Sequence, residues 1–230
     1  FGVKVFRNDN NLTIKCYKNS TAHKYALDNK IKCSPTLGKS SGNTVTANAV
    51  KGLKIGGRAS NALRLNWNSD SSVKGYIIEQ YRGGKWVRIA RLDNNKTNTY
   101  RIAGLSASST YKFRVKTFVF SGKKAVYSQY AYIKGKTNPR NITGLRIGWT
   151  AKDALRLNWN RNSGASGYIV ERYNGKKWVR VKEITSNKTT TLRVGKLASK
   201  KNYKFRVKAY SFDGNTQLYS GYSYINGTTK

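Results

Sequence analysis

The chain has 230 residues, of which 38% are hydrophobic and 12% aromatic, enough to build between one and three packed domains. Lysine and arginine together number 45 against 9 aspartates and glutamates, which gives a formal net charge of +36. A charge of this size favours anionic partners such as teichoic acids, other anionic glycans, lipid surfaces or nucleic acid, and it carries no information about the fold.

The residue inventory argues against catalysis and against metal binding. His23 is the only histidine, the carboxylates are scattered, and the two cysteines lack CxxC spacing, so neither a nucleophile–base pair nor a metal-ligand set can be assembled. No stretch reaches the roughly 18 apolar residues that span a bilayer. We therefore expect a non-enzyme without cofactor, metal or membrane span.

Residues 1–33 are predicted to form a short strand followed by a helix. Apolar and polar residues alternate over 12–16, as in a strand. Ser20 or Thr21 can cap a helix of about two turns, and Asn29 can end it in the left-handed conformation. The helix residues expected to face inward are Ala22, Tyr25 and Ala26.

The run LTIKCYKNSTAHKYALDNKIK in this segment resembles the terminal repeat of a BspA-type leucine-rich repeat array. A single capping repeat cannot bury its own face, so the resemblance implies further repeats before Phe1. Cys16 and Cys33 either form one disulfide in an oxidising compartment or remain two buried thiols. Residues 34–47 are predicted to be a flexible linker.

Two copies of one unit fill the rest of the chain, the first module at residues 48–138 and the second module at 140–230. Shifted by 92 residues, this part of the chain matches itself without a gap. Only Asn138-Pro139 joins the copies, and so short a joint, stiffened by proline, predicts a limited range of angles between them. The clearest recurrences are ALRLNWN at 62–68 and 154–160, and YKFRVK at 111–116 and 203–208.

Both modules are predicted to be built from strands. Leu63, Leu65 and Trp67 alternate with polar residues, a period of two that places three apolar side chains on one face. Breaks rich in glycine, asparagine and serine separate the apolar runs at turn-like spacing. About 90 residues with seven short strands fit an antiparallel sandwich.

These modules resemble fibronectin type III domains, especially the versions in secreted bacterial enzymes and surface proteins. The resemblance implies an all-β fold of two tandem seven-stranded immunoglobulin-like sandwiches, preceded by the short strand-turn-helix segment. It also implies a tyrosine corner in each module, in which the hydroxyl bonds back to the preceding turn. The residues that carry it are Trp67, Gly75-Tyr76-x-Ile78, Leu105 and Tyr111, with Trp159, Gly167-Tyr168-x-Val170, Leu197 and Tyr203.

Basic and aromatic side chains are expected on one face of each module. In such a sandwich the YKFRVK strand lies mid-sheet with its cations outward, and Trp86 would sit on an adjoining strand. This combination suits sugars bearing acid groups, or stacked bases. Alternatively, the long cationic stems only cover apolar sheet surface. The candidate anion- or glycan-binding residues are Lys85, Trp86, Arg88, Lys112, Arg114, Lys116, Lys177, Trp178, Arg180, Lys204, Arg206 and Lys208.

Six tyrosines near the ends of the modules are expected to form a last-strand cluster in each copy. Some are expected in the core and the remainder on a sugar-stacking surface. They are Tyr127, Tyr130, Tyr132, Tyr219, Tyr222 and Tyr224.

Together these features predict a non-catalytic accessory region of a bacterial protein, located outside the cell or at its surface. Its modules are expected to be monomeric, to act as spacers and to adhere to anionic wall polymer or glycan. A protein partner is a further option. One alternative is the non-catalytic tail of a secreted glycan- or peptidoglycan-degrading enzyme. Another is a nucleic-acid-binding module driven by charge alone.

Overall fold

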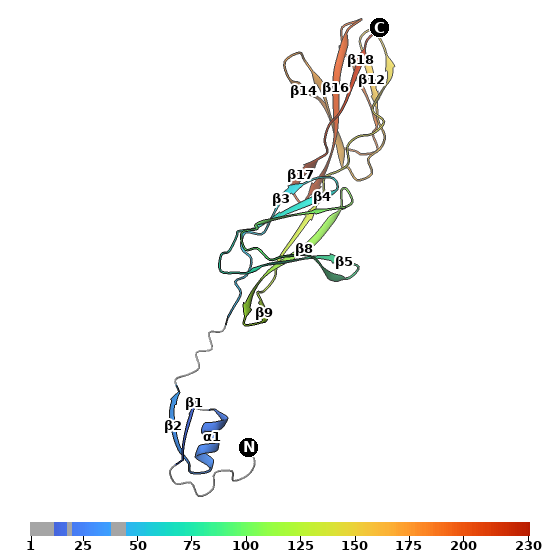
Figure 1. Ribbon diagram of the computed structural model, residues 1–230. Helices are drawn as coiled ribbons and strands as arrows, with labels where there is room; N and C mark the ends of the chain where they lie inside the picture. The colour runs from blue at the N-terminus through green and yellow to red at the C-terminus, as the bar shows by residue number, and fades with distance from the viewer. Residues whose placement is uncertain (1–11, 18–19, 38–44) are drawn as a thin grey trace. The chain divides into compact units, whose positions relative to one another are not determined.

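The computed structural model describes residues 12–17, 20–37 and 45–230. It divides into an N-terminal unit, Phe1–Val45, and a second unit, Thr46–Lys230, which contains both predicted sandwiches (Figure 1). Phe1 and residues 38–44 of the predicted linker lie outside the described residues. No helix in the described ranges has the length and apolar character that crossing a bilayer requires.

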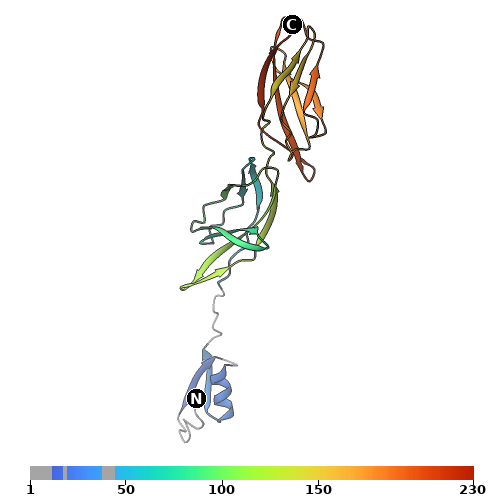
Figure 2. The ribbon, with the colours of Figure 1, turned by 90° about the vertical axis from the view of Figure 1, so that its right-hand side faces the viewer.

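The N-terminal unit is a strand–helix–strand motif, β1 (Thr13–Tyr17), α1 (Thr21–Asp28) and β2 (Lys32–Leu37). The two strands pair in parallel, and the helix lies beside them (Figure 2). Ser20 caps the helix, because its hydroxyl accepts a hydrogen bond of 3.2 Å from the His23 N–H. Cys16 and Cys33, on the two paired strands, form a disulfide.

The helix ends one residue later than the sequence suggested. The Ile31 N–H bonds to the Ala26 carbonyl and the Lys30 N–H to the Leu27 carbonyl, the pattern of a Schellman motif. This motif places the left-handed residue after the cap, so the positive φ of 52° falls on Lys30 and Asn29 has a φ of −107°.

Two other expectations for this unit need correction. Ala26 is buried and Tyr25 half-buried, but Ala22, on the first turn of the helix, is exposed. The segment assigned to the linker from residue 34 begins as a strand, because β2 continues to Leu37.

The first module is an antiparallel sandwich, as predicted. One sheet has the order β3-β4-β7 and the other β10-β8-β5-β6, with β9 also paired to β8. Its strands are β3 (Lys54–Arg58), β4 (Ala62–Asn66), β5 (Gly75–Arg82), β6 (Lys85–Leu92), β7 (Thr99–Ala103), β8 (Thr110–Ser121), β9 (Lys124–Tyr127) and β10 (Ala131–Lys136).

The second module repeats this topology, with β11-β12-β15 facing β14-β13-β16-β17 and with β18 also paired to β16. The all-β prediction of two tandem sandwiches with a short N-terminal strand–helix segment is confirmed. Its strands are β11 (Arg146–Thr150), β12 (Leu155–Asn158), β13 (Gly167–Tyr173), β14 (Trp178–Ile184), β15 (Thr191–Val194), β16 (Asn202–Asp213), β17 (Thr216–Tyr219) and β18 (Ser223–Thr228).

Each module has eight strand segments instead of seven because the last strand is split. In the first module Ser128 interrupts it, and the Ser128 hydroxyl accepts a 3.0 Å bond from the Thr117 N–H in place of a backbone carbonyl. Ser220 does the same for the Ala209 N–H in the second module, at 2.9 Å. The interruption lets the residues after it turn toward the outer face of the sheet.

The alternating residues of the sequence form the core of each sandwich. Leu63, Leu65 and Trp67 are all buried, and the Trp67 ring lies 5.2 Å from that of Tyr76. The position before this tyrosine requires a glycine for steric reasons, because a Cβ on Gly75 would lie 1.9 Å from the Leu92 carbonyl oxygen.

The predicted tyrosine corners are present in both modules. The Tyr111 hydroxyl accepts a 2.7 Å bond from the Ser106 N–H, and the Tyr203 hydroxyl accepts one of the same length from the Ala198 N–H. Both rings are half-buried. The resemblance therefore anticipated a hydrogen bond that ties the start of the YKFRVK strand to the turn before it in each sandwich.

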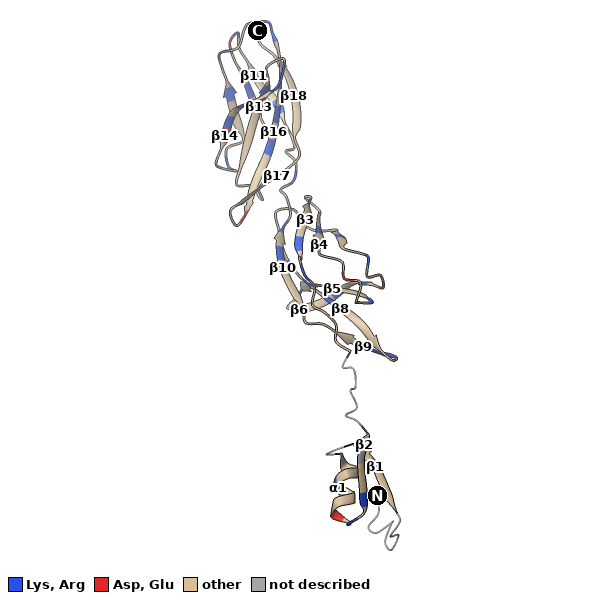
Figure 3. Cartoon of the chain, turned by 90° about the vertical axis from the view of Figure 1, so that its left-hand side faces the viewer, with Lys and Arg blue, Asp and Glu red and all other residues tan. Residues whose placement is uncertain are grey.

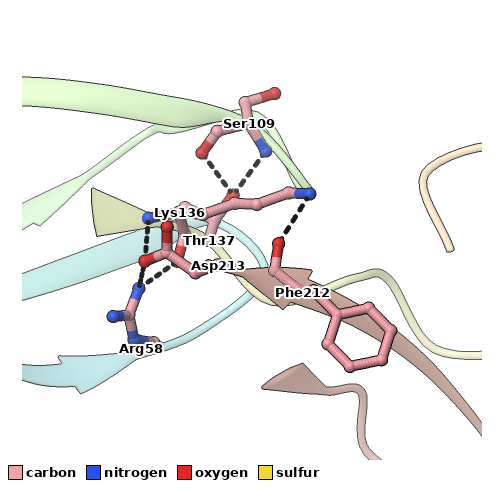
Figure 4. A network of polar contacts seen from close by, with 6 residues as sticks. All are labelled: Arg58, Ser109, Lys136, Thr137, Phe212 and Asp213. Carbon is pink, nitrogen blue, oxygen red and sulfur yellow. Dashed lines mark hydrogen bonds and ion pairs between the residues drawn. The ribbon is translucent and has the colours of Figure 1, made fainter. Parts of the chain in front are cut away.

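The two modules are joined by a polar network as well as by the chain (Figure 4). The Arg58 guanidinium donates to the Lys136 carbonyl at 2.7 Å and to the Asp213 carboxylate at 2.8 Å. Asp213 also accepts from the Lys136 N–H at 3.2 Å, and the Lys136 ammonium donates to the Phe212 carbonyl at 3.1 Å. Arg58 and Asp213 are mostly buried, so these bonds bring the β16–β17 hairpin of the second module against the first.

Candidate binding face

The YKFRVK strands lie in the middle of their sheets. In the first module β8 runs between β10 and β5, and its side chains alternate between the core and the outer face. Phe113 and Val115 are buried, which places Lys112, Arg114 and Lys116 outside. Basic residues occur throughout both sandwiches and acidic ones are sparse (Figure 3).

Arg114 forms the centre of a layered arrangement on this face. Its guanidinium carbon lies 3.8 Å from the centroid of the Tyr130 ring and 4.6 Å from that of Trp86. The Arg114 Nε–H donates to a Glu79 carboxylate oxygen at 2.6 Å, and the Tyr130 hydroxyl donates to the other at 3.1 Å. The arginine and glutamate side chains are only 20% and 14% exposed.

The surroundings keep this arginine charged. Burial alone would lower the pKa of Arg114, but its hydrogen bond to Glu79 and the neighbouring negative charge outweigh burial, and the pKa is raised. Its charge is already compensated within the protein by Glu79. Arg114 is therefore less available than an unpaired cation to attract anions from solution.

The lysines on either side are not ion-paired. The Lys116 ammonium lies 4.1 Å from the Tyr127 centroid and 4.6 Å from that of Tyr130, and the Lys112 ammonium lies 5.7 Å from Tyr81. No carboxylate of the described residues forms an ion pair with either lysine. These two ammonium groups can still meet an external anion, beside rings on which a sugar could rest.

The second module repeats the arrangement closely. The Arg206 guanidinium carbon lies 3.8 Å from the Tyr222 centroid and 4.6 Å from that of Trp178, and its Nε–H donates to Glu171 at 2.5 Å. Its pKa is likewise raised, because the bond and charge of Glu171 outweigh burial. The ammonium of Lys208 lies 4.1 Å from the ring of Tyr219.

The tryptophan is not on the strand next to the cations. Trp86 belongs to β6, which β5 separates from β8. A register shift between Ile78 and Glu79 pairs Tyr81 with Trp86, and the large indole spans β5 to contact Arg114. The same correction applies to Trp178 on β14.

The expectation that some of the terminal tyrosines lie in the core is wrong. Tyr127, Tyr130 and Tyr132 are half-buried or exposed, as are their three counterparts in the second module. The split in the last strand places Tyr127 on β9 and Tyr130 between strands, so simple alternation does not apply. All six therefore contribute to the outer surface.

The remaining candidate residues lie at the margin of this face. Lys85 and Arg88 are exposed on β6, where Arg88 pairs in register with Glu79. Arg180 is exposed and forms a 2.8 Å ion pair with Glu183. Lys177 lies in the turn before β14, and Lys204 is exposed on β16.

Sequence reasoning missed the two glutamates and the two tyrosines Tyr81 and Tyr173. One signal was available, because Glu79 precedes Arg114 by 35 residues and Glu171 precedes Arg206 by the same number. In a chain with only nine acidic residues, the recurrence of both partners indicates a shared structural role.

The face combines positive charge with aromatic rings, a combination that suits contact with an anionic or polar ligand. Across the part of the chain that the structure describes, no group of three histidine, cysteine or acidic residues could bind a metal ion. The two carboxylates on the face, Glu79 and Glu171, are each ion-paired with an arginine, Arg114 and Arg206. Reversible binding is the chemistry that these residues support.

Comparison with known proteins gives a consistent family match. The family model "Fibronectin type III domain" matches residues 48–133 and 137–224. Chitinase A1 of Niallia circulans is 29% identical over 210 residues, an alignment that covers 84% of this chain and 28% of the chitinase. The chain thus spans under a third of that relative.

Solved structures with similar folds include two chicken proteins. A two-domain fibronectin type III segment of chicken tenascin is 16% identical, with a TM-score of 0.45, and the match covers 79% of this chain and all of that one. The FN1–FN3 domains of chicken CNTN1 are 19% identical, with a TM-score of 0.43, over 81% of this chain and 69% of theirs.

Proposed function

The chain belongs to the fibronectin type III family over both of its sandwiches, and from this premise we propose that the modules are non-catalytic accessory domains that bind anionic glycan or wall polymer. The observation that carries the proposal is the pair of lysines in each module that flank an internally neutralised arginine. Their ammonium groups have no carboxylate partner among the described residues, and those of Lys112, Lys116 and Lys208 lie beside tyrosine rings. The overall charge of +36 adds long-range attraction for a polyanion.

The proposal predicts weak, salt-sensitive retention on anionic polymers. Purified wall teichoic acid and a sulfated glycan should retain the chain at low salt and release it as salt rises. The reason is that the lysines of the protein displace counterions condensed on the polyanion, and this displacement becomes less favourable at high salt. Lys116→Gln combined with Lys208→Gln should lower the salt concentration at which the chain elutes.

Lys96→Gln combined with Lys188→Gln provides the matched control. These two lysines are exposed and, like Lys116 and Lys208, correspond across the repeat, but they lie in the loops before β7 and β15, away from the face. The face would be excluded as the binding surface if both double variants eluted alike. Stronger, equally salt-sensitive binding to single-stranded DNA would favour the nucleic-acid alternative.

A second candidate, favoured by the similarity to a chitinase, is the accessory region of a secreted glycan-degrading enzyme. Such a region would contact an uncharged polysaccharide through its rings. Retention on insoluble chitin that is independent of salt and lost on Trp178→Ala would support this candidate. Retention on anionic polymer alone would oppose it.

The proposed setting is extracellular or at a bacterial cell surface. The Cys16–Cys33 disulfide supports it, since disulfides persist in oxidising compartments. Fibronectin type III modules and a chitinase relative are compatible with the same location. Alkylation of freshly isolated native protein would contradict it if both cysteines reacted as free thiols.

We further propose that the N-terminal unit is a leucine-rich-repeat-like module. Its support is the parallel pairing of β1 with β2 across α1, the kind of strand–helix unit that stacks in solenoids. The parental gene should then encode repeats of about 20–29 residues upstream. A different kind of domain directly before this segment would contradict the assignment.

A further inference from the structure

A shallow groove on the first module lies beside the layered face. Its volume is about 300 Å³, and its walls are made by β6, β8 and β10. The aromatic part consists of Trp86 and the exposed ring of Tyr132, whose centroids are 5.8 Å apart. The basic part consists of Lys112 and Lys134.

The two lysines place like charges directly opposite each other on this face. Lys112 and Lys134 are direct partners in the antiparallel register of β8 and β10, both are exposed, and neither has an ion-pair partner within the described residues. Like charges directly opposite on neighbouring strands destabilise a sheet. A single anion between the two ammonium groups would remove this repulsion and gain two charge-assisted contacts.

The second module keeps the rings and loses the charge pair. Trp178 and Tyr224 have centroids 5.8 Å apart, as in the first module, and Lys204 corresponds to Lys112. The register partner of Lys204, however, is Asn226 in place of a lysine. The repeated fold thus provides a natural comparison in which only one of the two cations has changed.

We propose that this groove in the first module is a subsite for one sugar ring that carries a negatively charged substituent, and that the second module lacks it. The ring would lie on Trp86, with its carboxylate or sulfate between Lys112 and Lys134. The inference rests on the proposed function of the face and narrows it to a site and a ligand class.

The geometry of the rings favours a sugar over a nucleic acid base. Trp86 and Tyr132 meet at 69°, edge to face, so they do not form the parallel platforms on which successive bases stack. A volume of about 300 Å³ is at the small end for ligand pockets, which suits a single ring on a polymer. The anionic group supplies the specificity through the two ammonium groups.

Calorimetric titration of the full chain can test the site with three tetrasaccharides: an oligogalacturonate, a heparin fragment and neutral chitotetraose. Lys134→Asn gives the first module the pattern of the second and should weaken binding of the charged ligands about tenfold, because one charged contact is lost. Asn226→Lys should create a second site and raise the stoichiometry from one to two. Comparing the affinities for the oligogalacturonate and the heparin fragment shows whether the site prefers a carboxylate or a sulfate.

A ligand-free measurement gives an independent readout. Lys134→Asn should raise the unfolding temperature of the first module by about 1–4 °C, because it removes the repulsion between cross-strand cations. An unchanged or lower temperature would overturn the argument from repulsion.

The outcomes separate the subsite from the wider proposal. If the chain binds the anionic sugars but neither substitution changes affinity or stoichiometry, the subsite is wrong and the binding face stands. If no anionic ligand binds at all, both fail together. Binding of oligouridylate that surpasses both sugars and depends on Lys134 would overturn the choice of ligand.

Discussion

Replacing Glu171 by glutamine should destabilise the second module, because Glu171 is the ion-pair partner of Arg206 on its binding face. The change removes the carboxylate that neutralises Arg206, and both side chains are less than a fifth exposed. Removing one partner of a fully buried ion pair costs about 3–5 kcal/mol. Glutamine keeps one acceptor oxygen, and the rings of Tyr222 and Trp178 still flank the guanidinium, so we expect about 2 kcal/mol.

Native-state hydrogen exchange followed by mass spectrometry measures this effect within one molecule. A loss of 2 kcal/mol corresponds to roughly 30-fold faster exchange of the β16 amides, while the first module serves as an internal reference. Asp153→Asn is the control, because its pairing with Arg193 at 3.5 Å is largely exposed and should be worth under about 1 kcal/mol. Similar exchange in the two variants would refute the view that this ion pair holds the face together.

Three further predictions concern other parts of the chain. Burial first, and then the nearby negative charge, raise the pKa of Tyr210, so its stabilising effect is intact below the unfolded pKa near 10 and is lost as pH rises through the folded value. Tyr210→Phe, which reproduces Phe118 of the first module, should therefore reduce alkaline unfolding of the second module in denaturation curves between pH 8 and 11.5; an unchanged pH dependence would contradict this. Asp213→Asn should loosen the joint between the modules, detected as residual dipolar couplings that no longer fit one alignment tensor, whereas a shared tensor would show that the ion pair is dispensable. Replacing Cys16 and Cys33 by serine should destabilise the N-terminal unit by about 3 kcal/mol without altering exchange in either sandwich, because the bridge closes a loop with a sequence separation of 17.

The fold could be predicted from the sequence because the strand patterns that define it lie within short segments and occur in both modules. Alternation in ALRLNWN and YKFRVK defines which side chains enter the core, and the 92-residue recurrence identifies the module boundaries. The tyrosine corner was also accessible, since its partners are only five residues apart.

The site was only partly predictable because it depends on register between strands far apart in the sequence. No residue close to Arg114 in the sequence indicates that Glu79 will neutralise it, so the sequence alone places it with Lys112 among the candidate anion- or glycan-binding residues. The position of Trp86 depends on a shift after Ile78, and alternation cannot anticipate such a shift. The outward turn of Tyr130 likewise depends on a serine hydroxyl that interrupts the last strand.

The joint between the modules has a consequence for how this protein could have grown. Asp213, Arg58 and Lys136 make the contact, yet the repeat places Ser121, Thr150 and Thr228 at the corresponding positions. If the second module were duplicated once more, the β16–β17 hairpin of the added copy would meet Thr150 and Thr228. Its aspartate would then have no cationic partner. Recombination that reversed the order of the two modules or added a further copy would lose this ion-pair network. The two modules are therefore not interchangeable, and their order along the chain matters.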